Sequence, residues 1–105
     1  MAQFAVYENP NPKTRKTYPY LLDIQSQLLD ELRTTVVIPL SPVKIAGSAA
    51  ISKLCPVVEI DNKSYIVMTQ QLAGIDRTIL GRAICDLSDY RSDIIVAVDF
   101  IISGI

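Results

Sequence analysis

Residues 88–105 read SDYRSDIIVAVDFIISGI, and this stretch decides how the chain folds. Ser88 is a residue type that commonly caps a helix, and Asp89 and Asp93 place negative charge where the dipole of a helix N-terminus favours it. From residue 94 onward the chain is almost entirely apolar. The β-branched residues of that run also suit a strand, but the cap and the length of the run favour a C-terminal helix.

The predicted helix has two neighbouring stripes of residues at helical spacing. The first stripe consists of Ile94, Val98, Ile101 and Ile102. The second stripe consists of Ile95, Asp99, Ile102 and Ser103. A helix this apolar cannot be solvated all round, so one face should pack on a sheet and another should meet a partner or a second copy of the chain.

Upstream of the helix, short β-branched or aromatic runs alternate with polar turns, which is typical of antiparallel strands. The predicted strands cover residues 4–7, 18–25, 34–40, 56–60, 63–69 and 79–87. The last of these also has helical features, and we assign it as a strand. Polar turns should cover 27–33 and 70–78, and 41–55 suits a loop with a helical turn.

Two local features refine this pattern. Asp61-Asn62 is a two-residue connection of the kind that closes a tight hairpin. Pro39 cannot donate to a strand ladder, so the strand over 34–40 should be bulged there or lie at a sheet edge. The expected architecture is one domain over residues 1–105, a small mainly-β barrel or α+β domain that ends in a helix. A chain of this size buries only about two thirds of its unfolded surface, so pairing with a second copy would add stability.

The composition excludes several classes of function. The net charge is −1, whereas proteins that live on a phosphate backbone or an anionic membrane usually carry a marked positive excess. Histidine is absent, which removes Ser-His-Asp and Cys-His hydrolysis and histidine-ligated zinc. No apolar run is long enough to span a membrane and no signal pattern opens the chain, so a cytoplasmic location is expected. Cys55 and Cys85 should be ordinary half-buried thiols in a reducing compartment.

Two groups of residues could carry chemistry, but each has a simpler explanation. Ser41-Pro42-Val43-Lys44 matches S-x-x-K, in which a lysine activates a serine. Its companion motifs are missing and Pro42 disfavours the helix that the motif needs, so we interpret it as accidental. Asp86, Asp89 and Asp93 could bind a hard cation, although capping and the helix dipole explain acidic residues at a helix start. We therefore expect no metal, no cofactor and no catalytic residue.

A third group mixes basic and aromatic side chains. Lys13, Arg15 and Lys16 lie close in sequence to Tyr18 and Tyr20, a combination that can bind single-stranded nucleic acid. With a net charge of −1, a solvated loop is the better interpretation. No direct sequence-specific binding of nucleic acid is expected.

The end of the chain is unusual because chain ends are normally polar and frayed. Gly104-Ile105 instead leaves an apolar side chain beside the terminal carboxylate. Two explanations are open at this point: Ile105 packs into the core, or it is left for a partner.

The whole chain resembles the CcdB family of toxins from toxin–antitoxin pairs. The matching segments, in order, are Gln3-Phe4-x-Val6-Tyr7, Asp23-Ile24-Gln25-Ser26 followed by Leu28-Leu29, Val37-Ile38-Pro39-Leu40, Pro56-Val57-Val58-x-Ile60, Met68-Thr69, Asp86-Leu87-Ser88 and the closing Gly104-Ile105. No single segment is diagnostic, but their order and spacing together are specific.

The resemblance implies an SH3-like antiparallel β-barrel of the CcdB/MazF type with a C-terminal helix, built as a homodimer. It implies a toxin that is not an enzyme, that binds DNA gyrase through its gyrase A chains and that traps the gyrase–DNA cleavage complex. A CcdA-like antitoxin would neutralise it. Carried over from the family, the gyrase-binding positions are Ser26, Leu28, Leu29, Asp99, Ile102, Ser103, Gly104 and Ile105.

This sequence departs from the family at Ser103. Better-known relatives carry a tryptophan directly before the final Gly-Ile, whose ring stacks on an arginine of gyrase, and this chain has no tryptophan. Losing such an anchor commonly costs about 2 kcal/mol or more of binding energy. Asp99 stands where the family has asparagine, and its carboxylate could partly compensate opposite an arginine. The alternatives are an mRNA-cleaving toxin of the MazF type, and a non-toxic chromosomal homologue that still binds antitoxin.

Overall fold

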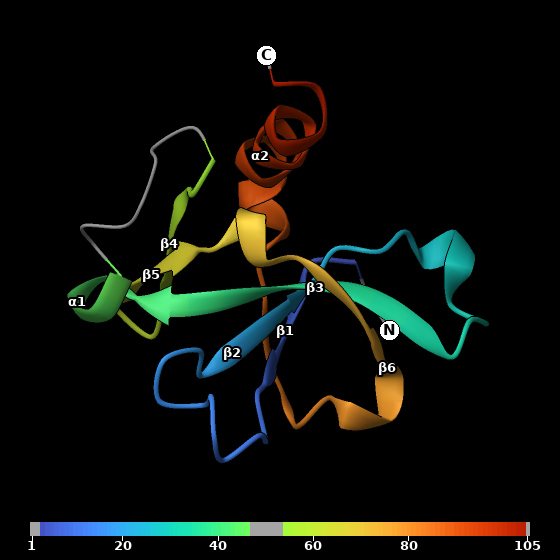
Figure 1. Ribbon diagram of the computed structural model, residues 1–105, viewed down its shortest axis with the longest axis horizontal. Helices are drawn as coiled ribbons and strands as arrows, with labels where there is room; N and C mark the ends of the chain where they lie inside the picture. The colour runs from blue at the N-terminus through green and yellow to red at the C-terminus, as the bar shows by residue number, and fades with distance from the viewer. Residues whose placement is uncertain (1–2, 47–53, 105) are drawn as a thin grey trace.

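The strands form one antiparallel sheet that curls into a half-barrel, with a C-terminal helix against it (Figure 1). The computed structural model describes residues 3–46 and 54–104. Within those residues the strands are β1 (Ala5–Glu8), β2 (Tyr20–Asp23), β3 (Thr34–Pro42), β4 (Val57–Ile60), β5 (Lys63–Val67), β6 (Ala73–Asp76) and β7 (Ala83–Asp86). The helices are α1 (Val43–Ala46) and α2 (Arg91–Ser103), and short 3-10 turns occur at η1 (Gln27–Leu29), η3 (Thr69–Gln71), η4 (Arg77–Ile79) and η5 (Ser88–Tyr90). This confirms the predicted fold class, a small antiparallel β domain that ends in a helix.

The long strand β3 organises the sheet, whose order is β4-β5-β3-β2-β1-β7. On one side β3 pairs with β2. On its other side the first half, from Thr34 to Val37, pairs with β6, and the last residues, from Leu40 to Pro42, pair with β5. The sheet therefore splits along β3 and curls, as Figure 1 shows.

Pro39 lies where β3 changes partners, so the expectation of a sheet edge is wrong. The backbone N–H of Met68 donates to the Pro39 carbonyl over 3.0 Å. The nitrogen and carbonyl of one strand residue face the same neighbour, so the donor that proline lacks points to the junction between β6 and β5. The ladder between β3 and β2 therefore runs past Pro39 without losing a bond.

The hairpin between β4 and β5 confirms the predicted turn. Ile60 pairs with Lys63, and both intervening residues have positive φ, 51° at Asp61 and 64° at Asn62. Positive φ at both central positions defines the turn type whose twist matches two antiparallel strands. Aspartate and asparagine tolerate that conformation better than other residues with a side chain, which is why this pair closes the hairpin.

Two expectations about strands are wrong in part. The segment predicted as a polar turn over 70–78 contains β6, which pairs with β3 through its backbone although Ala73 and Gly74 are poor strand formers. The strand predicted over 79–87 is confined to β7, and Ile79 belongs to η4. In the loop predicted over 41–55, α1 is the expected helical turn, and residues 47–53 lie outside the described part of the chain.

The cap of the C-terminal helix also differs from expectation. Ser88 does not cap α2; it begins η5, and its backbone N–H donates to the Asp86 carboxylate over 2.7 Å. Hydrogen bonding with Ser88 lowers the pKa of the Asp86 carboxyl. Asp93 lies in the first turn of α2, as predicted, where its charge complements the helix dipole.

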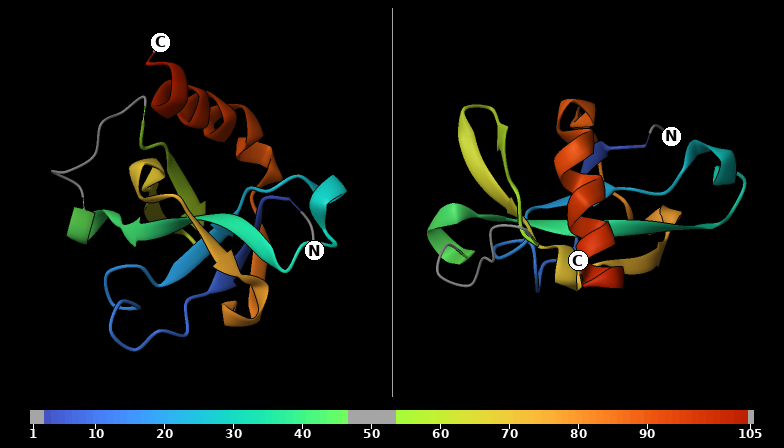
Figure 2. Two further views of the ribbon diagram at one scale, coloured as in Figure 1. Left: turned by 45° about the vertical axis from the view of Figure 1, so that its right-hand side comes forward. Right: turned by 90° about the horizontal axis from the view of Figure 1, so that it is seen from above.

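The core joins the sheet to α2. Its fully buried members include Val6, Leu22, Ile38, Leu40, Val58 and Ile94. Ile94 and Ala97 are the buried residues of α2, and the half-buried Val98 packs beside them, so this face lies on the sheet. Ile102 is 78% exposed and does not join the packed stripe. Figure 2 shows the C-terminal end of α2 projecting away from the sheet.

Candidate functional site

The outward face of α2 carries the first group of predicted site residues. Every member of the second predicted stripe is exposed, and that stripe comprises Ile95, Asp99, Ile102 and Ser103. The face combines apolar side chains with one carboxylate, at the end of the helix farthest from the sheet (Figure 2). Exposed apolar surface of this kind marks protein interaction sites more often than catalytic ones.

Hydrogen bonds within α2 fix the last residues that the structure describes. The Ser103 hydroxyl donates to the Asp99 carbonyl over 2.7 Å. The Gly104 N–H donates to the Phe100 carbonyl over 2.8 Å, with Gly104 in the left-handed conformation at a φ of 74°. Gly104 therefore has a structural role, because a left-handed glycine ends a helix with little strain. Ile105 lies outside the described residues, so both explanations of its side chain stay predictions.

The second group of predicted residues lies on the loop between β2 and β3. Ser26 caps η1 because its hydroxyl accepts a hydrogen bond from the Leu28 N–H over 3.2 Å. Leu28 is 93% exposed, and Leu29 is also exposed. Leu32, which the sequence reasoning missed, is 48% exposed on the same loop. Three exposed leucines on one short loop form a compact apolar surface, which we call the leucine loop (residues 24–33).

The leucine loop is fastened at its base by polar contacts that sequence reasoning also missed. The Arg77 guanidinium donates to the carbonyls of Leu32, over 2.7 Å, and Leu29, over 3.3 Å. Gln25 donates across the neck of the loop to the Thr34 carbonyl over 3.1 Å. Arg77 lies more than forty residues from the loop in sequence, so no local pattern identifies it.

The two groups lie apart in space. In Figures 1 and 2 the leucine loop and the end of α2 are separated in every view. The structure thus brings together Ser26, Leu28 and Leu29 on one loop, and Asp99, Ile102, Ser103 and Gly104 on one helix end, without joining the two sets. A single partner that contacts both must be large, as a protein surface is.

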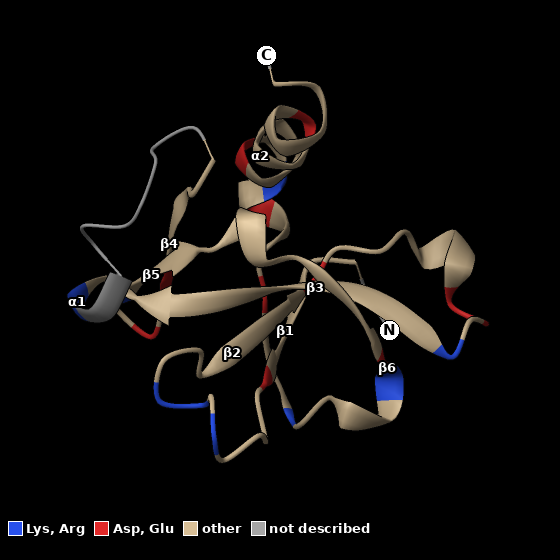
Figure 3. Cartoon of the chain, viewed as in Figure 1, with Lys and Arg blue, Asp and Glu red and all other residues tan. Residues whose placement is uncertain are grey.

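Charge is distributed unevenly over the molecule. Figure 3 shows acidic residues along η5 and α2, whereas the loop between β1 and β2, with Lys13, Arg15 and Lys16, lies on the far side of the sheet. The ring of Tyr20 packs edge-on against Tyr65, with 5.3 Å between the ring centres. Burial is the main cause that raises the pKa of the Tyr20 hydroxyl. This tyrosine therefore serves packing rather than stacking on a base.

The remaining candidates for chemistry are not brought together. Ser41 is fully buried on β3 and Lys44 is exposed on α1, so S-x-x-K does not form the helical arrangement that its chemistry uses. Across residues 3–46 and 54–104, no group of three or more cysteine, aspartate or glutamate residues is placed to hold a metal ion. Cys55 is buried and Cys85 half-buried, and both are free thiols, as expected. Burial also raises the pKa of the Cys85 thiol, which makes it a poor nucleophile.

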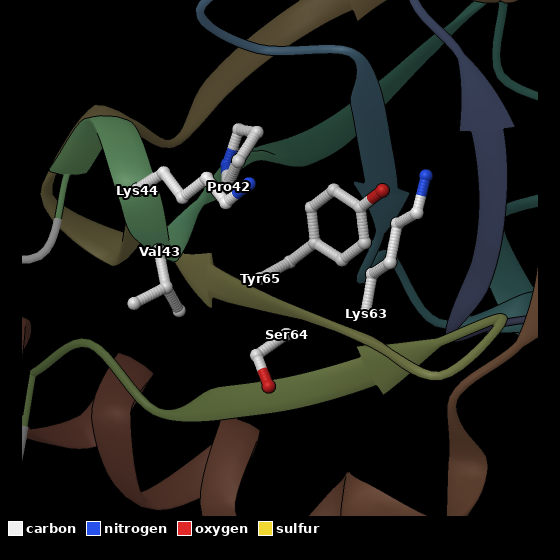
Figure 4. Close-up of a pocket in the computed structure, with 6 residues that line it drawn as sticks. All are labelled: Pro42, Val43, Lys44, Lys63, Ser64 and Tyr65. Carbon is white, nitrogen blue, oxygen red and sulfur yellow. The ribbon is translucent and has the colours of Figure 1, made fainter.

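A hollow of about 450 Å³ lies between β5 and α1 (Figure 4). Its lining consists of Pro42, Val43, Lys44, Lys63, Ser64 and Tyr65. Lys44 and Lys63 lie on either side of the Tyr65 ring. None of the predicted site residues contributes to this hollow, so it is separate from both the leucine loop and the end of α2. In the described residues no helix is long and apolar enough to cross a membrane.

Comparison with known protein families covers nearly the whole molecule. The model of the family described as CcdB protein matches residues 3–104 of the 105 residues. The matched region runs from just before β1 to the glycine that ends α2, and it includes the leucine loop. The chain belongs to the CcdB protein family.

Proposed function

We propose that this protein is the toxin of a type II toxin–antitoxin system that binds the gyrase A chains of DNA gyrase and traps the gyrase–DNA cleavage complex. Its family is one of gyrase-binding toxins that are not known as enzymes. The observation that carries the proposal is the free end of α2, where Ile102 is 78% exposed beside the exposed Asp99. A protein that acts by binding needs an exposed apolar contact of this kind and no reacting group.

The proposed partners and assembly follow from the same surface. We propose a cytoplasmic homodimer, because two copies would present two α2 ends to the two-fold symmetric pair of gyrase A chains. A CcdA-like antitoxin would neutralise the toxin by covering part of this surface. Asp99 would face a basic group of gyrase, since a carboxylate and an arginine form strong paired hydrogen bonds.

Ser103 makes this contact different from that of relatives with tryptophan. Its hydroxyl is already bonded to the Asp99 carbonyl, so the side chain offers a partner little beyond its small size. The affinity should therefore rest on Ile102 and the leucine loop. We expect weaker gyrase binding than a tryptophan-bearing relative would show.

A binding measurement tests the proposal directly. The purified protein should bind the dimerisation fragment of gyrase A, and Ile102→Ser should weaken that binding at least about tenfold. Ile79→Ser is the matched control, because Ile79 is also an exposed isoleucine but lies on η4. Absence of binding by the unaltered protein would overturn the proposal, and equal losses in the two variants would show that the end of α2 is not the contact.

A test in cells addresses toxicity. Deleting Gly104-Ile105 should abolish killing on expression, because it removes the terminus that the proposal places against gyrase. Undiminished killing by the truncated form would contradict it. Ser103 also favours a second candidate, a non-toxic homologue that keeps only antitoxin binding. Harmless overexpression together with tight binding of the antitoxin tail would support that second candidate.

A further inference from the structure

The leucine loop has no apolar anchor of its own. Its three leucines are exposed, and none of the residues in η1 is buried. A short loop whose apolar side chains face water cannot be held in place by hydrophobic packing. Its conformation must therefore depend on polar contacts at its base.

Arg77, at the start of η4, supplies most of those contacts. Its Nε donates to the Leu32 carbonyl over 2.7 Å and its Nη2 donates to the Leu29 carbonyl over 3.3 Å. The same Nη2 lies 3.9 Å from the Asp30 carboxylate. The side chain is only 16% exposed, so these contacts are shielded from water, which strengthens them.

A buried carboxylate holds Arg77 from the other side. Nη1 of Arg77 lies 3.9 Å from Oδ2 of Asp23, a residue with almost no exposed surface. Asp23 in turn accepts hydrogen bonds from the Thr35 hydroxyl, over 2.8 Å, and the Gln25 N–H, over 3.1 Å. The guanidinium therefore bridges a fixed point inside the sheet and two carbonyls of the loop. A planar group with donors on several sides suits this task better than a lysine amine would.

We propose that Arg77 is a positioning residue that clamps the leucine loop and thereby presents Leu28 to the partner protein. This inference deepens the proposed function and rests on it, in that the partner is taken to be gyrase. Holding the loop in its binding conformation before the encounter removes an ordering cost from the binding step.

The variants for the test separate clamping from folding. Arg77→Met alone leaves the buried Asp23 charge without its cation, which can unfold a protein. The double variant Asp23→Asn with Arg77→Met removes both charges, and an asparagine oxygen can still accept from Thr35 and Gln25. Arg33→Met is the matched control, because the Arg33 side chain is 90% exposed and touches Asp76 rather than the loop carbonyls.

Amide hydrogen exchange is the first readout. In the double variant, amides of the leucine loop should exchange at least about tenfold faster while those of α2 keep their protection. The Arg33→Met variant should leave both regions unchanged. Unchanged exchange in the loop of the double variant overturns the proposal, whatever happens to gyrase binding.

Coupling to Leu28 is the second readout, and a merely structural role would not produce it. Binding to the gyrase A fragment should weaken roughly threefold to tenfold in the double variant. Adding Leu28→Ala should then cost much less affinity than Leu28→Ala costs in the unaltered protein. Equal costs in the two backgrounds overturn the proposed link to Leu28. If the unaltered protein does not bind the fragment at all, the proposed function fails, while hydrogen exchange still decides whether Arg77 clamps the loop.

Discussion

The Ser103 hydroxyl donates a hydrogen bond to the Asp99 carbonyl, 2.7 Å away, so one predicted contact residue is tied to the backbone of another. Ser103 lies at an exposed position near the end of α2, with no core contact to lose. A larger side chain can therefore replace it without disturbing the fold.

Ser103→Trp should raise the affinity for the gyrase A fragment about tenfold or more, because a buried aromatic anchor adds binding energy on the order of 2 kcal/mol. Isothermal titration with the fragment measures this. Ser92→Trp is the control, since Ser92 is an exposed serine at the opposite end of α2, and it should leave the affinity unchanged. Equal affinities of the Ser103→Trp protein and the unaltered protein would mean that this helix end does not contact gyrase.

Substitution of Gly81 and of Gly104 should destabilise the protein to different extents. A Cβ on Gly81 would meet the Glu8 carbonyl oxygen at 2.6 Å, so Gly81→Ala forces backbone apart and should cost more than about 2 kcal/mol. A Cβ on Gly104 would touch nothing within 4 Å, so only its positive φ opposes alanine, at about 1 kcal/mol. Urea denaturation measures both. Gly74→Ala, which also has open space and no positive φ, is the control and should be within about 0.5 kcal/mol of the unaltered protein.

Ile94 and Ile102 lie on one helix but should respond oppositely to truncation. Ile94 is fully buried in the core, so Ile94→Ala should lower the free energy of unfolding by about 2–5 kcal/mol and spare the contact surface. Ile102→Ala should change stability by less than about 0.5 kcal/mol and weaken partner binding. Thermal unfolding and titration on both variants check this; a large loss of stability from Ile102→Ala would show that its side chain is packed.

Acid should destabilise the protein through two aspartates. Hydrogen bonds from Thr78 lower the pKa of the Asp76 carboxyl, and hydrogen bonding with Ser88 lowers that of Asp86. Because the folded state has the lower pKa, their contribution is complete above the ordinary pKa of 3.8 and is lost as the pH falls below it. Replacing both with asparagine should flatten the fall of the urea midpoint between about pH 5 and pH 2. A slope as steep as that of the unaltered protein would assign the acid sensitivity to other groups.

Local chemistry was enough to predict several elements. Aspartate and asparagine tolerate positive φ, so the turn at Asp61-Asn62 could be predicted from two residues. The length and apolar content of residues 88–105 indicated the helix, and the stripe with Asp99 and Ser103 is the one that faces away from the sheet.

What could not be predicted depends on partners distant in sequence. Strand β6 exists because β3 supplies its hydrogen bonds, and nothing in Ala73-Gly74 favours a strand. Pro39 is tolerated only because two different strands meet beside it. Arg77 looks like a surface arginine until the fold carries the leucine loop to it. At the candidate site, resemblance to the family supplied Leu28 and Leu29, whereas the residues that hold their loop required the structure.

The pairing of β1 with β7 has a consequence for how the protein is made. Val6 pairs with Cys85, so the first strand to leave the ribosome waits for one of the last before its open edge is covered. Only α2 follows, and it carries both Ile94, which closes the core, and the exposed Ile102. Such non-local closure slows folding. The sheet and the surface that it supports are therefore completed together, at the very end of translation, and a nascent chain has little opportunity to engage a partner early.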